Sequence, residues 1–279
     1  MTKLQLIAFD LDGTFLDDAK RIPEINMEAL LTAREQGVLI VPATGRLYKG
    51  LPDEVRELCR YFILINGAKV YDAVEDRVLY SADIPLDLAL KIYDYGDTLP
   101  CVYDAYVKDD GRMSQRMFDV MEDYLPDKNY AKMMRVLRKP VPDLKQSLID
   151  EQTDVQKAQY YFQDLEERER QIRRLDEQFP GQLYVSTSLE SNIEINYYRA
   201  TKGRALRGLC QALGIDCRQA AAFGDGTNDL SMIEDAGFGV AMCNGAERCR
   251  AAADFVTEYN NNAGGFGREL LKLLNYQKT

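Results

Sequence analysis

The sequence predicts an α/β protein with a doubly wound parallel sheet and an inserted α+β domain. Short apolar segments alternate with helical patterns near the N-terminus, and the same alternation returns toward the C-terminus. Longer charged helices and isolated strand-like segments fill the stretch between them. The chain of 279 residues is long enough for about two domains at roughly 100 to 200 residues each.

The N-terminal half of the sheet is predicted from residues 4–9, 38–43 and 62–65, which are strand-sized apolar runs, and from a helix at residues 25–36. This β-α-β order is typical of parallel strands joined by helical crossovers. Residues 69–71 and 78–80 then predict a β-hairpin.

The C-terminal half is predicted from strands at residues 193–196, 220–223 and 239–242 and from helices at residues 202–213 and 229–235. The stretch before it combines a charged helix at 164–179 with strand-like segments at 102–107, 158–162 and 183–186. We therefore expect a core of residues 1–83 and 188–279 and an inserted domain of residues 84–187. Such an insert is expected to lie over the carboxyl ends of the core strands, where open sheets bind ligands.

Composition excludes several classes of function. The 45 acidic and 35 basic residues give a net charge of -10, so binding to nucleic acid would have to overcome repulsion and is not expected. The absence of histidine excludes Ser-His-Asp and Cys-His catalysis and every histidine-ligated metal site. Acid-base chemistry must therefore come from Asp, Glu, Lys, Tyr or Cys.

The N-terminal apolar run is interrupted by Asp10 and Asp12 before a signal peptide or a spanning helix could be complete. We therefore expect a cytoplasmic protein with no membrane partner. The six cysteines are scattered and include no CxxC pair, which indicates reduced, structural thiols. The oligomeric state does not follow from the sequence.

The first strand ends in Phe9-Asp10-Leu11-Asp12-Gly13-Thr14, which places two carboxylates at a glycine turn. An ordinary turn also favours Asp and Gly. However, crowded carboxylates are costly unless a cation or a reaction uses them. An EF-hand calcium loop starting at Asp10 would need Gly where Phe15 stands and Glu where Arg21 stands, so that interpretation fails.

The second predicted strand ends in Thr44-Gly45-Arg46, which offers a hydroxyl and flexible backbone amides at a predicted helix start. Such a segment suits an anion, although an ordinary capped turn fits it equally well. Lys202 begins a predicted helix, where a cation opposes the helix dipole and a surface lysine is the usual alternative.

The strand at 220–223 leads into a loop with two carboxylates four residues apart, Asp225 and Asp229 of Gly-Asp-Gly-Thr-Asn-Asp. A dinucleotide-binding fingerprint would need Gly in place of Asp229 and should follow the first strand. Acidic metal ligands are therefore the better interpretation of this motif.

In this order the motifs resemble those of the haloacid dehalogenase-like (HAD) superfamily of phosphohydrolases, which use an aspartate nucleophile. Asp10 and Asp12 match its first motif, Thr44 its second, Lys202 its third, and Asp225 with Asp229 its fourth. The position of the insert, and the segments at 239–242 and 254–257, resemble the Cof-like, type IIB sugar-phosphatase branch. That resemblance implies a Rossmann-like core and an α/β cap that selects the substrate. Cys243 and Thr201 depart from the usual Gly and Ser of that branch.

The resemblance also implies the catalytic roles. Asp10 would attack phosphorus and form an aspartyl-phosphate, and Asp12 would protonate the leaving group and later activate water. Mg²⁺ would be held by Asp10, the backbone carbonyl of Asp12 and Asp225, with Asp229 as a further ligand or a supporting group.

The remaining expected site residues concern the substrate. Thr44, Lys202 and backbone amides would hold the phosphoryl oxygens. Asn228 would support Lys202 or the phosphate. Gly45 and Arg46 would line the substrate site, although Arg46 could instead contact only the inserted domain.

The resulting expectation is a Mg²⁺-dependent phosphatase, a phosphoric monoester hydrolase acting on a small phosphate ester. Candidate substrates are sugar phosphates, nucleotides, flavin mononucleotide and pyridoxal phosphate. A phosphotransferase or phosphomutase with the same nucleophile, and a non-catalytic protein that binds phosphorylated metabolites, are the alternatives.

Overall fold

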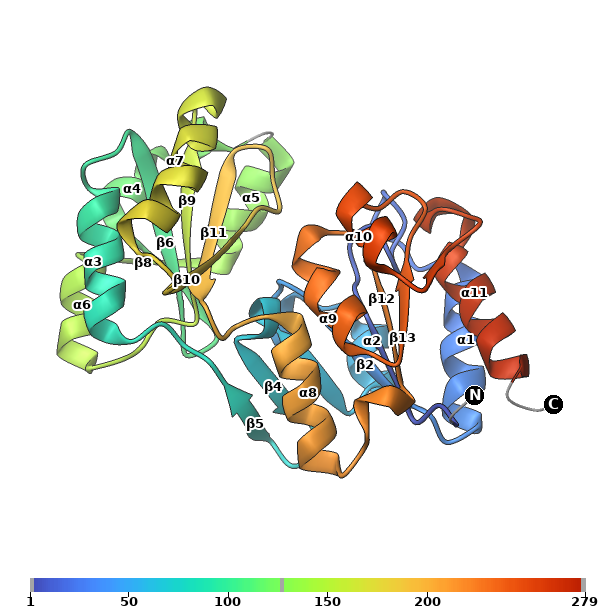
Figure 1. Cartoon of the computed structure of the whole chain (residues 1–279). Coiled ribbons are helices and arrows are strands. Elements are labelled where there is room, and N and C mark those ends of the chain that lie inside the picture. Colours follow the sequence, from blue (N-terminus) through green and yellow to red (C-terminus); the bar gives the residue numbers. More distant parts are fainter. Residues whose placement is uncertain (1–2, 126–127, 277–279) are drawn as a thin grey trace. The chain divides into compact units, whose positions relative to one another are not determined.

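The computed structural model describes residues 3–125 and 128–276, without the side chains of residues 129 and 276. The chain forms two units (Figure 1). Met1–Ser81 and Thr201–Thr279 form the first, which we call the core unit, and Ala82–Ala200 form the second, the insert unit.

The core unit is built on a five-stranded parallel sheet of order β14-β13-β12-β1-β2. These strands are β1 (Leu6–Phe9), β2 (Leu39–Pro42), β12 (Ala220–Gly224), β13 (Phe238–Ala241) and β14 (Phe255–Val256). All four residues of β1 are buried, as expected for a central strand of a sheet covered on both faces. The predicted α/β class with a doubly wound parallel sheet is therefore confirmed.

Helices cover the two faces of this sheet (Figure 1). On one face, Leu6 and Ala8 of β1 pack in a cluster with Leu206 and Leu209 of α8. On the other face, the ring of Phe266 in α11 lies 5.3 Å from that of Phe9. The core-unit helices are α1 (Glu24–Glu35), α2 (Asp53–Leu58), α8 (Lys202–Leu213), α9 (Leu230–Asp235), α10 (Glu247–Ala252) and α11 (Gly265–Tyr276).

The predicted hairpin is confirmed as β4 (Lys69–Asp72) and β5 (Arg77–Ser81), which pair antiparallel with a register shift between Val70 and Tyr71. The strand before it, β3 (Tyr61–Leu64), pairs antiparallel with β4. We expected it to continue the parallel sheet, but its parallel link is a single bridge between Ala43 and Ile63. This strand therefore belongs to the antiparallel sheet of the hairpin and not to the parallel sheet.

The insert unit holds a six-stranded mixed sheet of order β10-β11-β9-β6-β7-β8. Its strands are β6 (Cys101–Val107), β7 (Asp110–Ser114), β8 (Arg138–Val141), β9 (Lys157–Phe162), β10 (Leu183–Ser186) and β11 (Asn192–Tyr197). Its helices are α3 (Leu86–Gly96), α4 (Gln115–Val120), α5 (Lys128–Leu137), α6 (Leu144–Glu151) and α7 (Leu165–Gln178). Tyr93, Tyr103 and Tyr160 form part of its core.

One assignment needs correction. The strand predicted at 193–196 for the core is β11, and it pairs antiparallel with β9 and β10 of the insert unit. The insert unit thus runs to Ala200 rather than ending at residue 187. The reason lies in its alternation, because Asn192, Glu194 and Asn196 on one face oppose apolar residues on the other. That pattern is typical of an antiparallel strand with two different faces, whereas the core strands are apolar throughout.

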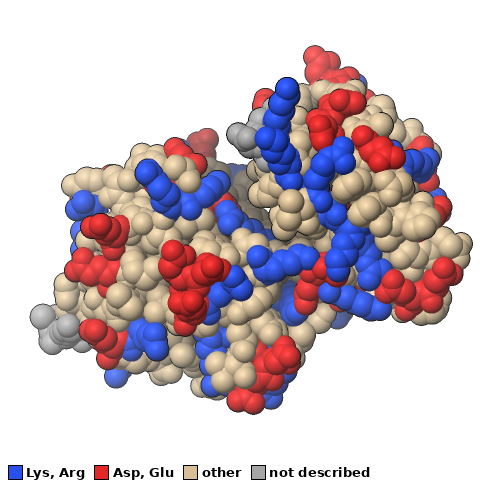
Figure 2. Space-filling view, turned by 180° about the vertical axis from the view of Figure 1, so that it is seen from behind, with Lys and Arg blue, Asp and Glu red and all other residues tan. Residues whose placement is uncertain are grey.

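Three further properties bear on the expectations from the sequence. Within the described ranges, no helix is both long and apolar enough to cross a bilayer. All six cysteines are free thiols, and four of them are buried. On the face shown in Figure 2, acidic and basic side chains are intermingled.

Candidate active site

The polar motifs meet at the carboxyl edge of the core sheet because neighbouring parallel strands end there. Asp10 follows β1 directly, and its backbone N–H donates to the carbonyl of Phe223 in β12 at 2.9 Å. Asp225 follows β12 directly, and Thr44 follows β2 after one residue. Asp10 and Thr44 are buried, with 6% and 1% of their surface exposed. The sheet therefore gathers three of the predicted site residues at one edge.

Lys202 is a fully buried cation at the first turn of α8. The Thr201 hydroxyl caps this helix by accepting from the Arg204 N–H, which sets where Lys202 emerges. The Lys202 ammonium donates to Asp10 Oδ1 and to Asp229 Oδ1, each at 2.5 Å. Burial opposes its charge, but the two carboxylates outweigh burial and raise the pKa of Lys202. The surface-lysine alternative is therefore wrong.

Asp10, Asp225 and Asp229 form a carboxylate cluster in which one oxygen from each lies within 4.8 Å of the others. Burial, and then the neighbouring carboxylates, raise the pKa of Asp10 well above its usual range and that of Asp225 to about 6. A divalent cation would relieve this crowding, and oxygen-only ligands are those that Mg²⁺ prefers. The donor set therefore fits the expected metal.

The three carboxylates are not equivalent. Asp229 already uses both oxygens, since Oδ1 accepts from Lys202 and Oδ2 accepts from the N–H groups of Asp225 and Gly226 at 2.9 and 2.8 Å. Asp225 Oδ1 accepts from the Thr14 hydroxyl at 2.8 Å. Asp229 is thus placed to hold the loop and Lys202, whereas Asp10 and Asp225 are better placed to bind a cation directly.

The glycine turn after Asp10 is required by close approach. Gly13 has φ of +87°, and a Cβ at this position would lie 2.4 Å from Asp225 Oδ2. Asn244 fixes the turn by donating from Nδ2 to the Gly13 carbonyl at 2.8 Å. Any side chain at Gly13 would therefore disturb the carboxylate cluster.

Asp12 is bound by two cations. Arg46 donates from Nε to Asp12 Oδ2 at 2.8 Å and from Nη2 to Oδ1 at 2.6 Å, and Lys20 donates from Nζ to Oδ1 at 2.7 Å. Burial alone would raise the pKa of Asp12, but Arg46 and then Lys20 lower it. We expected Arg46 at the substrate or at the inserted domain, and the structure brings it to the predicted acid-base residue. Lys20 was not anticipated from the sequence.

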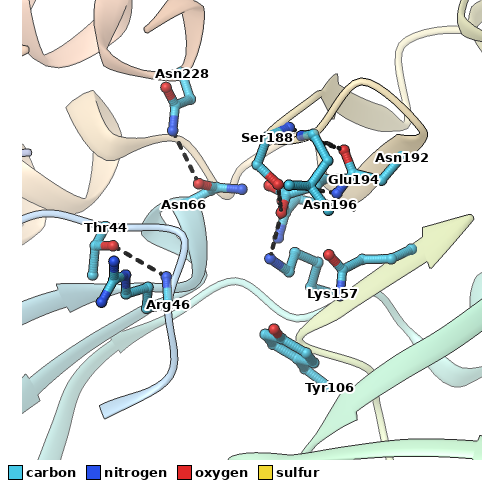
Figure 3. A network of polar contacts seen from close by, with 12 residues as sticks. Thr44, Arg46, Asn66, Tyr106, Lys157, Ser188, Asn192, Glu194, Asn196 and Asn228 are labelled. Carbon is cyan, nitrogen blue, oxygen red and sulfur yellow. Dashed lines mark hydrogen bonds and ion pairs between the residues drawn. The ribbon is translucent and has the colours of Figure 1, made fainter. Parts of the chain in front are cut away.

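A second group of contacts surrounds Thr44 (Figure 3). The Thr44 hydroxyl accepts from the Arg46 N–H at 3.2 Å, and Asn228 donates from Nδ2 to Asn66 Oδ1 at 3.2 Å. A Cβ on Gly45 would lie 2.8 Å from the same Asn66 oxygen. Asn66 is buried in the left-handed region with φ of 58°, a conformation that proteins tend to keep at functional sites. Asn66 was not among the site residues expected from the sequence, although an Asn before Gly is a signal for such a conformation.

The insert unit carries its own polar network, on the face of its sheet formed by alternate residues of β6, β9 and β11 (Figure 3). Lys157 pairs with Glu194 at 2.9 Å, and the Ser188 hydroxyl donates to the same carboxylate at 2.9 Å. The Lys157 ammonium lies 4.6 Å from the centre of the Tyr106 ring. Buried charged residues set this face apart from the apolar face of the same sheet, and it was not expected from the sequence.

Comparison with known proteins agrees with this geometry. The family model for haloacid dehalogenase-like hydrolases matches residues 7–270, so the chain belongs to this family. Phosphatase YwpJ of Bacillus subtilis is 30% identical over an alignment of 292 positions that covers 94% of this chain and 97% of that protein. The 5-amino-6-(5-phospho-D-ribitylamino)uracil phosphatase YcsE of the same organism is 27% identical over 268 residues, with 94% and 92% covered. An HMP-PP phosphatase of Escherichia fergusonii is 28% identical over 250 residues, with 88% and 87% covered.

Solved structures give the same result. A haloacid dehalogenase-like hydrolase from B. subtilis has a TM-score of 0.82 and 27% identity, with 97% of this chain and 100% of the other covered. A sugar phosphatase of HAD subclass IIB shares the fold, with a TM-score of 0.78, 21% identity and 96% and 98% covered. The chain is thus a hydrolase of the haloacid dehalogenase-like family, and the curated relatives that it matches are named as phosphatases. The predicted family, fold and enzyme class are confirmed.

Proposed function

We propose that the chain is a Mg²⁺-dependent phosphoric monoester hydrolase that works through an aspartyl-phosphate on Asp10. The observation that carries this proposal is the buried Lys202 ammonium, which bridges Asp10 and Asp229 at 2.5 Å while Asp225 completes the carboxylate cluster. A buried cation that orients a carboxylate beside a metal-type donor set is suited to phosphoryl transfer, which depends mainly on positioning and charge neutralisation.

In this reaction a carboxylate oxygen of Asp10 forms a bond to phosphorus while the ester P–O bond breaks. Asp12, whose pKa is lowered by Arg46 and Lys20, first takes up a proton from solvent and then gives it to the departing oxygen. Water then attacks the phosphorus of the aspartyl-phosphate, its proton passes to Asp12, and inorganic phosphate and the free Asp10 carboxylate are restored. Bound Mg²⁺, held by Asp10, Asp225 and the Asp12 carbonyl, would neutralise charge on the transferring group.

The other core-unit residues position the phosphoryl group. Lys202 keeps Asp10 in one orientation and offers positive charge beside it. The Thr44 hydroxyl and the backbone amides of the turn after Asp10 would hold phosphoryl oxygens. Asn228 would act through Asn66, to which it donates, rather than through Lys202.

The insert unit is proposed to select the substrate. Its sheet carries the polar face that contains Lys157 and Glu194, and such a face can hydrogen-bond the organic part of a metabolite. The named relatives act on phosphate esters with different organic groups, which supports selection by a variable part of the chain. Sugar phosphates, nucleotides, flavin mononucleotide and pyridoxal phosphate therefore remain the classes to compare.

The proposal is tested by measuring the turnover of phosphate esters and by trapping the aspartyl-phosphate. Purified protein with Mg²⁺ should release inorganic phosphate from members of this panel, and Asp10→Asn should release none. With p-nitrophenyl phosphate, Asp12→Asn should release a burst of nitrophenolate and then stall. The departing phenolate needs no proton, whereas the attacking water still needs a base to take its proton. Intact-mass analysis should then find a phosphate adduct on Asp10. Turnover by Asp10→Asn, or full activity in excess chelator, would overturn the proposal.

A further inference from the structure

The contacts of Asp12 show that two cations meet on one carboxylate. Arg46 binds both of its oxygens through Nε and Nη2, and Lys20 adds a third contact at 2.7 Å. A planar arginine fork facing two oxygens is the arrangement by which proteins recognise a carboxylate or a phosphate. The pair Arg46–Lys20 is therefore spaced to hold one oxyanion.

Contacts other than those with Asp12 also fix the Arg46 guanidinium and the backbone of Lys20. Arg46 also donates from Nη1 to the Gly50 carbonyl at 3.1 Å. Lys20 adopts φ of 62° in a turn in which its N–H donates to the Asp17 carbonyl at 2.9 Å. The neighbouring Arg21 points to a different partner, Asp17. In this turn the Lys20 side chain contacts Asp12, whereas the Arg21 side chain pairs with Asp17 and does not contact Asp12.

Stability alone does not account for this arrangement. The side chains of Lys20, Arg46 and Asp12 are 57%, 29% and 37% exposed, and ion pairs at such exposure contribute little to stability. Asp12 is also the group that must reach the leaving oxygen of the substrate. As long as it bridges both cations, it is held away from that task.

We propose that Arg46 and Lys20 form a binding site for a second oxyanion of the substrate, a carboxylate or a second phosphate close to the ester. This inference rests on the proposed function. The second oxyanion takes the place of the Asp12 carboxylate between the two cations, an exchange in which no covalent bond is made or broken. The released Asp12 carboxylate then takes up a proton from solvent and gives it to the leaving oxygen of the ester. Substrates with an uncharged organic group leave Asp12 in the pair and react slowly.

The experiment compares matched substrates that differ in one anionic group. Glycerol 2-phosphate and 2-phosphoglycerate differ by a carboxylate, and fructose 6-phosphate and fructose 1,6-bisphosphate differ by a phosphate. Because a hydrogen bond to a charged group contributes about 1.5–3 kcal/mol, the anionic member should have a kcat/KM about 10- to 100-fold higher. The carboxylate and phosphate arms show which oxyanion the site prefers. The gain should appear in kcat as well as KM, since release of Asp12 affects the reaction itself.

The variants Arg46→Met and Lys20→Met should bring the ratio within each pair toward one, and Arg46→Lys should keep part of it. Arg21→Met is the matched control, because Arg21 lies in the same turn but pairs with Asp17. It should keep the full preference. Equal kcat/KM for both members of both pairs, or an unchanged preference in Arg46→Met, would overturn the inference while leaving the phosphatase proposal intact.

Binding provides a readout that does not need turnover. Asp10→Asn lacks the nucleophile, so calorimetry on this variant with Mg²⁺ can compare 2-phosphoglycerate with glycerol 2-phosphate directly. Tighter binding of 2-phosphoglycerate, lost on adding Arg46→Met, supports the second oxyanion site. Equal binding refutes it, whatever the outcome of the turnover and trapping experiments.

Discussion

Replacing Lys202 by Met removes a buried charge while keeping a side chain of similar length. The ammonium lies 2.5 Å from Asp10 Oδ1 and 2.5 Å from Asp229 Oδ1, and the side chain is fully buried. Without it, three crowded carboxylates lose the cation that two of them share. Removing one partner of a buried ion pair typically costs about 3–5 kcal/mol. We expect a loss of this size in the free energy of unfolding of Lys202→Met, measured in excess chelator.

Mg²⁺ should reverse part of that loss. The Lys202 ammonium repels any cation bound beside Asp10, so the variant should bind Mg²⁺ more tightly than the unchanged protein does. Free Mg²⁺ at 100 times its dissociation constant would stabilise the folded state by about 2.7 kcal/mol. The gain in stability on adding a fixed concentration of Mg²⁺ should therefore be larger for Lys202→Met, although the variant should be inactive as a phosphatase.

Urea unfolding and calorimetry, each with chelator and with Mg²⁺, measure both effects. Lys157→Met is the matched control, because Lys157 is 1% exposed and pairs with Glu194 at 2.9 Å in the insert unit. It should lose stability without any larger gain from Mg²⁺. The reasoning is refuted if Lys202→Met loses less than about 1 kcal/mol in chelator, the size of a surface pair. A smaller gain from Mg²⁺ than in the unchanged protein would refute it too.

Three further perturbations test other parts of the site. Asp225→Asn should sharply raise the Mg²⁺ concentration needed for half-maximal activity. Asp229→Asn should chiefly lower the unfolding temperature, because Asp229 holds Lys202 and two backbone N–H groups. An equal rise in the Mg²⁺ requirement of both variants would contradict these separate roles. Burial and then Asp229 raise the pKa of Asp225 to about 6, so the metal-free folded chain keeps a proton that the unfolded chain loses near 3.8. This protonation contributes fully to stability below the unfolded-state pKa of 3.8, and its contribution is lost as the pH rises through about 6. At pH 7.5 in chelator, urea unfolding should therefore find Asp225→Asn more stable than the unchanged protein by about 1–3 kcal/mol. Gly13→Ala should weaken Mg²⁺ binding in calorimetry, since its Cβ would lie 2.4 Å from Asp225 Oδ2, and wild-type affinity in this variant would argue against the close approach.

The sequence was sufficient for elements whose signals are local. The strand at 220–223 and the helix at 202–213 match β12 and α8 closely, because apolar runs end at Gly and Asp and because Thr201 caps the helix. Site residues that directly follow such strands could be predicted too, since the ends of parallel strands meet. Asp10 and Asp225 are the clearest cases.

Features that depend on distant partners could not be predicted in this way. The strand β11 has the composition of a strand, but only its pairing with β9 places it in the insert unit. Lys20 reaches Asp12 because one residue adopts a left-handed conformation, and no short-range pattern in the sequence signals that at a lysine. Arg46 was identified, but which of its possible partners it binds depends on the turn at Gly50.

The order of the strands along the chain also affects how this protein folds during its synthesis. β1 lies between β2 and β12, with Leu6 opposite both Leu39 and Ala220. A ribosome adds about 5–20 residues per second, so roughly 10 to 40 s pass between the synthesis of β1 and that of β12, its second neighbour in the sheet. The whole insert unit is made in that interval, while an apolar strand keeps one edge unpaired. The nucleophile Asp10 is therefore among the first residues to emerge, and its surroundings are among the last to assemble. Chaperone dependence in this chain should follow the delay before β12 appears rather than the overall length.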